Sequence, residues 1–309
     1  MKKGILFSLL LLTIAASTAQ EKINELVKYS LPVKSINLNS ETIAYAEEGS
    51  GEKTLLFIHG LSSTLDAWKK NIQGLKDDYR CIAVDLPGYG KSSRNSTNYS
   101  LSDYGGMLQE FIKKKDLKNV ILVGHSMGGQ IAMHTVLNYP EDFQKLILIA
   151  PAGIETFTEQ EATLMKASYT PVMVVNTTND QILANYKLNF FEFPEDAQQM
   201  VDDRIRIKSA QDFPAYAEVV VNNIHAMLDE PVIDRIKEIN IPVLMIWGAN
   251  DMLIPNKYLH PSESIENLIK LSEEKFSDLE VEVIDKAGHF VNFEKAEEVN
   301  SEIREFLKN

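Results

Sequence analysis

The chain has 309 residues, with 31 Lys and Arg against 44 Asp and Glu, and its formal net charge is −13. Hydrophobic residues make up 44% of it and charged residues 24%, which is typical of a globular protein and excludes a disordered chain or a disulfide-stapled mini-domain. The acidic balance argues against nucleic acid or an anionic membrane as a partner, because both require clustered Lys and Arg.

Residues 1–19 have the pattern of a secretory signal peptide. Lys2 and Lys3 precede an apolar run over Ile5–Ala16, which is shorter than the roughly 20 residues that a membrane span needs. Small residues before Gln20 fit cleavage between Ala19 and Gln20. We therefore expect export to the periplasm or the extracellular space, with no stable membrane insertion after cleavage. Retention of the segment as an uncleaved anchor is the alternative.

Beyond this segment, short β-branched and apolar runs alternate with longer segments of helical periodicity, which is typical of a largely parallel sheet with crossover helices. An antiparallel hairpin is predicted at the start, over Ser35–Leu38 and Thr42–Glu47. Strands buried on both faces are predicted at Thr54–Ile58, Cys81–Val84, Val120–Val123, Leu146–Ile149 and Val243–Trp247. A further strand is expected at Val281–Ile284, and helices at Leu65–Leu75, Leu101–Lys115, Met127–Asn138, Ser264–Phe276 and Ala296–Leu307.

The alternation stops after Pro151, and about ninety residues pass before the strand at Val243, far more than a crossover needs. This stretch is rich in Phe, Tyr and Met in helical patterns, so it is not a linker. The sequence predicts a core domain over residues 20–151 and 235–309 and a helical cap over 152–234. A cap at the carboxyl edge of a parallel sheet typically covers a ligand site. The alternative is that these helices form a small second hydrophobic core that adds stability and covers no ligand site.

The most specific motif is GHSMG at residues 124–128, placed directly between a predicted strand and a predicted helix. This context is the one that the G-x-S-x-G nucleophile elbow requires. Side chains at Gly124 or Gly128 would collide with the neighbouring strand and helix. Ser126 would then present its hydroxyl at a helix N-terminus, where developing negative charge is favoured.

A serine nucleophile needs a base, and the base needs an acid to orient it. Of the six histidines, His289 follows the last predicted strand, on a loop at the carboxyl edge of the sheet. Asp251 follows the strand Val243–Trp247 on a loop at the same edge, and Asp285 is the reserve candidate. The order Ser126, Asp251, His289 matches nucleophile, acid and base in α/β-hydrolases.

Four further segments strengthen the likeness: HGL at residues 59–61, DLPGYGKS at 85–92, WGANDMLIP at 247–255 and GHFVNFE at 288–294. With these motifs the chain resembles the α/β-hydrolase fold superfamily, of the carboxylesterase and lipase kind. The resemblance implies an eight-stranded, mostly parallel sheet flanked by helices. It also implies an oxyanion hole made by the backbone N–H groups of Leu61 and Met127, which leaves both side chains free to shape the pocket.

The same resemblance gives supporting roles to residues near the triad. His59 and Gly60 would orient the oxyanion loop, and Asp85 would hold the turn that follows it. His125 would pack or hydrogen-bond behind the nucleophile, with direct contact to substrate as the alternative. His134, His225 and His260 are most simply surface or packing residues. The cap acids are predicted to be a solvated face, with amine binding as the alternative; they are Glu192, Glu195, Asp196, Asp202 and Asp203. No metal-ligand spacing or dinucleotide fingerprint is found, so no cofactor and no metal ion are expected.

These observations predict a serine hydrolase that cleaves carboxylic esters of small or medium apolar substrates through an acyl-enzyme on Ser126. The expected partner is a small-molecule ester. A carbon–carbon bond hydrolase, an enol-lactonase and a cofactor-free perhydrolase are alternatives with the same triad. A binding protein on the same scaffold is a fourth possibility, although such proteins commonly lose a triad member.

Overall fold

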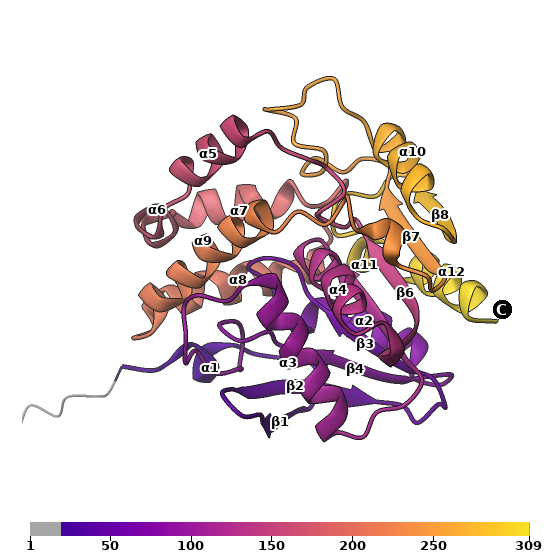
Figure 1. Ribbon diagram of the computed structural model, residues 1–309. Helices are drawn as coiled ribbons and strands as arrows, with labels where there is room; N and C mark the ends of the chain where they lie inside the picture. The colour runs from indigo at the N-terminus through magenta and orange to yellow at the C-terminus, as the bar shows by residue number, and fades with distance from the viewer. Residues whose placement is uncertain (1–19, 309) are drawn as a thin grey trace, which may run out of the picture.

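The structure, a computed structural model, describes residues 20–308 (Figure 1). They contain one eight-stranded sheet with the strand order β1-β2-β4-β3-β5-β6-β7-β8. The strands are β1 (Val33–Asn37), β2 (Thr42–Glu48), β3 (Thr54–Ile58), β4 (Arg80–Val84), β5 (Val120–His125), β6 (Phe143–Ile149), β7 (Val243–Gly248) and β8 (Leu279–Ile284). The sheet confirms the predicted fold class, whereas the predicted signal peptide lies outside the described residues.

The sheet begins with antiparallel pairs and continues in parallel. The pairs β1–β2 and β2–β4 are antiparallel, and every later pair is parallel. The central strands β3, β5 and β7 are buried along their whole length, as parallel strands covered on both faces must be. At the far edge, β8 is only half covered: its first four residues alternate between intermediate and exposed positions, Val283 is exposed and Ile284 is buried.

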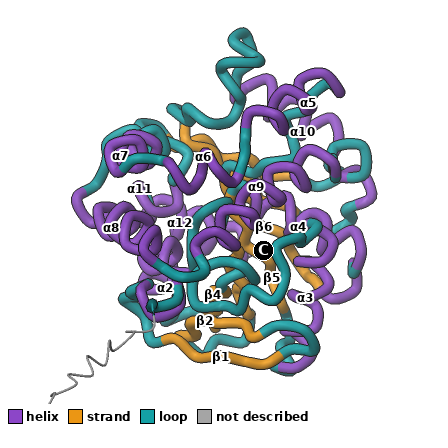
Figure 2. The backbone as a smooth tube through the Cα atoms, turned by 90° about the vertical axis from the view of Figure 1, so that its left-hand side faces the viewer, coloured by secondary structure: helices purple, strands orange, loops and turns teal. Residues whose placement is uncertain are grey.

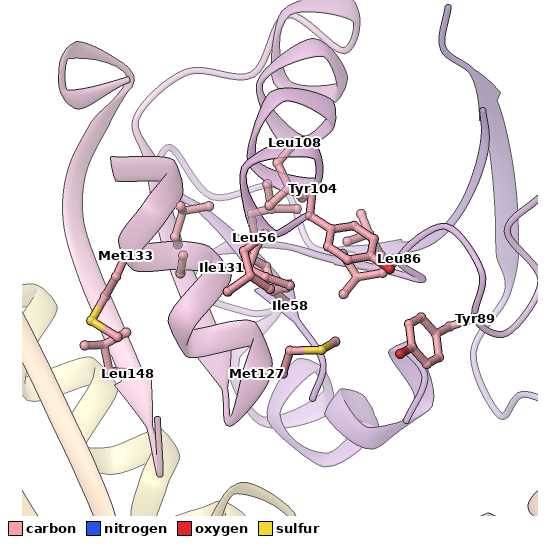
Figure 3. Close-up of a cluster of buried hydrophobic side chains, with 14 of the residues drawn as sticks. Leu56, Ile58, Leu86, Tyr89, Tyr104, Leu108, Met127, Ile131, Met133 and Leu148 are labelled. Carbon is pink, nitrogen blue, oxygen red and sulfur yellow. The ribbon is translucent and has the colours of Figure 1, made fainter. Parts of the chain in front are cut away.

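Helices cover both faces of the sheet. Leu56 and Ile58 of β3 pack with residues of α3 (Leu101–Lys114) and α4 (Met127–Asn138), as Figure 3 shows. The intervening Leu55 and Phe57 point to the opposite face, where they join residues of α2 (Lys69–Leu75) and α12 (Ala296–Lys308). Because successive strand residues face opposite sides, one strand anchors both helical layers.

The helix predicted over residues 65–75 is divided in two. It starts as a 3-10 turn, η1 (Leu65–Trp68), in which the Ala67 N–H donates to the Thr64 carbonyl at 3.2 Å, and it continues as α2. The Leu65 N–H is bound instead by the carboxylate of Asp85 at 2.8 Å. This long-range bond satisfies an N–H group that a helix leaves without an internal acceptor, and it ties the first turn to Asp85.

Five helices lie between β6 and β7, and we call them the cap: α5 (Glu159–Ser168), α6 (Pro171–Asn176), α7 (Asn179–Lys187), α8 (Gln198–Arg206) and α9 (Phe213–Asp229). Threonine caps begin three of them, because the side chains of Thr158, Thr170 and Thr178 accept N–H groups of the first turn. In both views of the molecule α5 and β1 lie at opposite ends (Figures 1 and 2).

The cap is attached to the core mainly through α9. The buried amide oxygen of Asn223 on α9 accepts the hydroxyls of Tyr89 and Tyr104 at 2.6 and 2.9 Å. At the end of α9, the Gln130 amide of α4 donates to the carbonyls of Met227 and Glu230, both at 3.0 Å. The helix that follows Ser126 therefore contacts the cap directly. Across residues 20–308, no helix combines the length and apolar character needed to cross a membrane.

Candidate active site

Ser126 lies in a sharp turn between β5 and α4, with φ 53° and ψ −121°. Non-glycine residues rarely adopt positive φ, so the surrounding backbone must hold it there. A Cβ on Gly124 would lie 2.3 Å from the Gly128 carbonyl oxygen, and a Cβ on Gly128 would lie 2.3 Å from the Ile58 carbonyl oxygen. Both positions therefore require glycine, for the steric reason that the sequence suggested.

The structure brings His289 and Asp251 together from two loops. His289 Nδ1 and Asp251 Oδ2 are 2.7 Å apart, and both residues are buried. The other carboxylate oxygen accepts the N–H groups of Leu253 and Ile254 at 2.8 and 3.0 Å, which fixes the carboxylate plane. With Nδ1 engaged in this way, Nε2 is the ring nitrogen left to exchange a proton. The reserve candidate Asp285 is exposed at the surface.

Ser126 and His289 line the same cavity, although no hydrogen bond joins their side chains in the described part of the chain. Such contacts are often loose in ligand-free enzymes and tighten when substrate binds. The Ser126 N–H donates to the Ile149 carbonyl at 3.0 Å, and the Ser126 carbonyl accepts from Ala152 at 3.0 Å. The nucleophile candidate is thus held by the neighbouring strand on both sides of its peptide unit.

The two predicted oxyanion donors flank this serine. Met127 is the first residue of α4, where the helix leaves the N–H without an internal acceptor. Leu61 follows Gly60, at which a Cβ would lie 3.1 Å from both Ser126 Cβ and His125 Nδ1, so glycine permits the close approach of the loop. Leu61 lines the cavity, but the Met127 side chain packs into the core beside α3 (Figure 3). The expectation that Met127 shapes the pocket is therefore wrong, because helical geometry directs its side chain away from the cavity.

Two buried histidines support the site in neutral form. His59 Nε2 accepts the Leu86 N–H at 3.1 Å, Nδ1 contacts the Gly60 carbonyl at 2.8 Å, and burial lowers the pKa of His59 to about 4. His125 Nε2 lies 2.9 Å from the His289 carbonyl oxygen, and burial holds the pKa of His125 well below its usual value. Neither ring carries a positive charge at neutral pH.

Asp85 has structural bonds on both carboxylate oxygens. Oδ1 accepts the Leu65 N–H, while Oδ2 accepts the Lys91 N–H at 2.8 Å and the Tyr29 hydroxyl at 2.6 Å. Burial raises its pKa to about 6, and these bonds oppose the rise. Asp85 thus joins the turn at residues 85–92 to the loop behind Leu61 and does not line the cavity.

The cavity that contains Ser126 and His289 has a volume of about 510 Å³ and a mainly apolar lining. The apolar lining residues come from the cap, from the segment after β6, from the loop after Asp251 and from the loop of His289; they include Phe157, Met165, Tyr169, Ile224, Met227, Leu228, Met252, Leu253, Ile254 and Phe290. Lys257 is the only Lys or Arg in the lining, and its ammonium group donates to the Glu263 carbonyl at 2.9 Å. A cavity of this kind suits an apolar ligand.

The alpha/beta hydrolase fold family matches residues 53–296. The chain belongs to this family. Members of this fold family build their active sites on a nucleophile turn after a strand and on two loops at the same sheet edge, the positions that Ser126, Asp251 and His289 occupy here.

Curated relatives of this hydrolase carry several names. It is 27% identical over 267 residues to a dihydrolipoyllysine-residue acetyltransferase component of an acetoin cleaving system from Cupriavidus necator. The match covers 86% of this chain and 66% of the relative, so this chain spans just under two thirds of the relative's length. It is 26% identical to the uncharacterized hydrolase YugF of Bacillus subtilis, over 90% of this chain and 98% of the relative. A Paraburkholderia phymatum hydrolase of 2-hydroxy-6-oxononadienedioate and 2-hydroxy-6-oxononatrienedioate is 26% identical, over 86% and 90% of the two chains.

Among solved structures, a probable hydrolytic enzyme from Pseudomonas aeruginosa superposes with a TM-score of 0.84. The two chains are 20% identical, and the match covers 94% of this hydrolase and 99% of the other chain. At this identity the likeness shows the shared fold.

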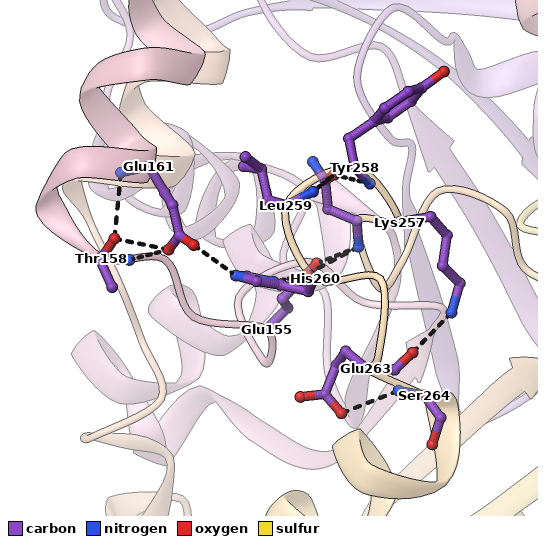
Figure 4. A network of polar contacts seen from close by, with 10 residues as sticks. Glu155, Thr158, Glu161, Lys257, Tyr258, Leu259, His260, Glu263 and Ser264 are labelled. Carbon is purple, nitrogen blue, oxygen red and sulfur yellow. Dashed lines mark hydrogen bonds and ion pairs between the residues drawn. The ribbon is translucent and has the colours of Figure 1, made fainter.

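One polar network of this hydrolase was missed by sequence reasoning, which placed His260 among surface or packing residues (Figure 4). His260 Nδ1 lies 2.5 Å from Glu155, and Nε2 lies 3.3 Å from Glu161 of α5. Glu155 also accepts the Asn256 N–H at 2.9 Å, and Phe157 stacks on the His260 ring at 5.2 Å. The hydrogen bond to Glu155 raises the pKa of His260. The network joins the cap to the loop that follows Asp251.

A second network joins the cap to the base loop. The carboxylate of Glu294 accepts three N–H groups, from Gly288 at 2.8 Å, from Phe191 at 3.1 Å and from Glu192 at 2.7 Å. The Phe290 N–H donates to the Asn189 carbonyl at 2.8 Å. The sequence marked Glu294 only as the end of a motif, and nothing in the sequence indicated that it binds the cap.

The acidic residues that the sequence places in the cap lie away from the cavity around Ser126. Of the cap acids, Asp203 is half-buried, the other four are exposed, and none lines the cavity around Ser126, which fits a solvated face. Across residues 20–308, no group of three or more His, Cys, Asp or Glu side chains is arranged to hold a metal ion.

Proposed function

We propose that this hydrolase cleaves carboxylic esters of small or medium apolar substrates through an acyl-enzyme on Ser126. The observation that carries the proposal is a single apolar cavity lined by Ser126 and His289, with His289 bound to Asp251. An uncharged ester fits this cavity because its acyl group needs apolar surroundings and its carbonyl needs only hydrogen-bond donors.

The reaction starts with attack of Ser126 Oγ on the ester carbonyl carbon, while the hydroxyl proton moves to His289 Nε2. Asp251 stabilises the imidazolium and holds its orientation. The N–H groups of Leu61 and Met127 donate to the oxyanion of the tetrahedral intermediate. As the intermediate collapses, the carbon–oxygen bond to the alcohol breaks and the alcohol takes the proton from His289.

Deacylation repeats these steps with water. Water gives a proton to His289 and its oxygen adds to the acyl carbon, and the bond to Ser126 Oγ then breaks as the serine takes the proton back. The carboxylic acid leaves and the free enzyme is restored. Besides the ester and one water molecule, every step uses only the residues named.

A carbon–carbon bond hydrolase is the second candidate, because one relative is named for the hydrolysis of 2-hydroxy-6-oxononadienedioate. That substrate is a dicarboxylate, and cationic side chains are the usual partners of carboxylates. The cavity here offers only Lys257, whose ammonium group is bound to a backbone carbonyl. This lining favours an uncharged ester. An enol-lactonase or a perhydrolase would use the same groups.

The test is hydrolysis of p-nitrophenyl esters of increasing chain length by the protein from Gln20 onward. We expect a chain-length optimum and a loss of turnover of up to about a millionfold in Ser126→Ala. A serine-reactive phosphonate should form one adduct per chain, on Ser126. Equal turnover in the variant would refute the acyl-enzyme proposal. If the folded protein forms no adduct with the phosphonate, that result would favour a binding protein.

We also propose that the protein is exported and cleaved between Ala19 and Gln20. Residues directly after this point are part of the fold, since the Glu21 carbonyl accepts the Gln211 N–H at 3.0 Å and the Ile23 N–H donates to Asp212 at 2.9 Å. N-terminal sequencing of protein recovered from the exported fraction should begin at Gln20. A sequence that begins at Met1 would contradict the proposal.

A further inference from the structure

Large exposed apolar side chains gather on two segments beside the mouth of the active-site cavity. We call them the apolar rim: Leu164, Tyr169, Val172, Met173 and Val175 of the cap, and Met252, Leu253 and Tyr258 of the loop after Asp251. Half of them, namely Tyr169, Met252, Leu253 and Tyr258, also line the cavity. The rim is therefore continuous with the inner surface that leads to Ser126.

The cap part of the rim centres on α6. In this six-residue helix Val174 packs against the core cluster, whereas Val172 and Met173 are 67% and 56% exposed and Val175 is also exposed. On the other side of the mouth, Tyr258 is 98% exposed. A helix that only faced water would carry polar residues on its outer side. Several exposed apolar side chains on segments that border one cavity are typical of an interaction surface.

The charges around the rim point to the nature of the partner. The chain contains 44 Asp and Glu, yet neither residues 164–178 nor residues 252–260 include one. The first segment contains Lys166, which is paired with Asp229 of the cap, and the second contains Lys257 and the titratable His260. The carboxylates near these segments are already paired, Asp229 with Lys166 and both Glu155 and Glu161 with His260, which leaves the Lys257 charge at the edge of the rim. Apolar segments without carboxylates of their own complement the acyl chains of a phospholipid layer, and Lys257 complements its phosphate groups.

We propose that the apolar rim docks this hydrolase on a phospholipid surface, with the cavity mouth facing the lipid. Apolar esters then pass from the lipid to Ser126 without crossing water, a step that rests on the proposed function, whereas docking itself does not. The rim side chains are too few to span a bilayer, so the contact is peripheral and reversible.

The experiment is cosedimentation of the protein from Gln20 onward with phosphatidylcholine vesicles. The test variant is the double substitution Val172→Ser and Met173→Ser, because neither side chain lines the cavity. The matched control is Val283→Ser, since Val283 is 46% exposed on β8 at the far edge of the sheet. We expect the rim variant to bind about tenfold or more weakly and the control to bind like the wild type.

Two further measurements separate docking from catalysis. Hydrolysis of a short, water-soluble p-nitrophenyl ester should be unchanged in the rim variant, which shows that it is folded, while hydrolysis of a long-chain ester in vesicles should fall with binding. Ser126→Ala should bind vesicles like the wild type. Absence of vesicle binding by the wild type, or equal binding by the rim variant, would overturn the proposal. A dimer that forms without lipid and is lost in the rim variant would assign the rim to a second copy instead.

Discussion

Replacement of Glu294 tests whether the base loop depends on the cap for its position. The carboxylate accepts N–H groups of Gly288, Phe191 and Glu192 at 2.8, 3.1 and 2.7 Å. Hydrogen bonds to a charged acceptor contribute roughly 1.5 to 3 kcal/mol each, and the lower end applies to a half-buried group. Glu294→Ala removes all three and should lower the free energy of unfolding by about 3 to 5 kcal/mol. Glu294→Gln keeps one acceptor oxygen and turns an NH2 group toward a backbone donor, so about 1 to 3 kcal/mol should be lost.

Replacement of Glu294 should also lower the catalytic rate, because Gly288, one of the groups that its carboxylate binds, directly precedes His289. A displacement of the base by about 1 Å can cost a hundredfold in rate. We expect Glu294→Gln to lower kcat about tenfold on a p-nitrophenyl ester, with a smaller effect on KM. Urea unfolding and steady-state kinetics measure the two effects. Glu297→Gln is the matched control, since Glu297 is exposed on the neighbouring helix. If Glu294→Gln matched that control in both assays, the idea that this carboxylate positions the base would be refuted.

Three more outcomes are expected. Gly128→Ala should lower the free energy of unfolding by more than about 3 kcal/mol in a urea titration, because the new Cβ would lie 2.3 Å from a backbone carbonyl, whereas Gly106→Ala has room and should be neutral or stabilising. Asp251→Asn should lower kcat by about a thousandfold or more with an unchanged circular dichroism spectrum; a small loss would exclude Asp251 as the acid. The pKa of His260 is raised in the fold, so its ion pair with Glu155 stabilises fully below the unfolded pKa of about 6.5, and this contribution is lost as pH rises through the folded pKa. The stability difference between wild type and His260→Gln should therefore shrink as pH rises above about 6.5, and a difference that stays constant over this rise would refute the ion pair.

Most of the sheet could be predicted because its central strands are buried on both faces. Such strands are continuous apolar runs, and Thr54–Ile58 has the same ends in the sequence pattern and in the structure. The helix Met127–Asn138 also has the same ends in the prediction and in the structure, because a glycine-containing turn directly precedes it. The prediction for the edge strand β8 began two residues too late, at Val281 instead of Leu279, because its first residues alternate in exposure and give a weaker apolar pattern.

The turn around Ser126 could be predicted for a local reason, since its glycines and flanking elements are adjacent in sequence. The carboxyl ends of parallel strands also meet at one edge, which allowed His289 and Asp251 to be placed near each other before the structure. The contacts of His260 and Glu294 could not be predicted. Each joins residues about a hundred positions apart, and an ordinary Glu or His at such a separation leaves no periodic signal.

The position of the cap between β6 and β7 has a consequence for how such a protein can change. These strands are hydrogen-bonded neighbours, so the sheet requires only one crossover there, which a dozen or so residues can provide. The rest of the inserted chain can diverge in sequence and length, provided that α9 keeps Asn223 for its bonds to Tyr89 and Tyr104 and that the segment 189–192 keeps its backbone bonds to Phe290 and Glu294. New ligand preferences can therefore arise by changes in the cap between these anchor points, without changes in the strands of the sheet.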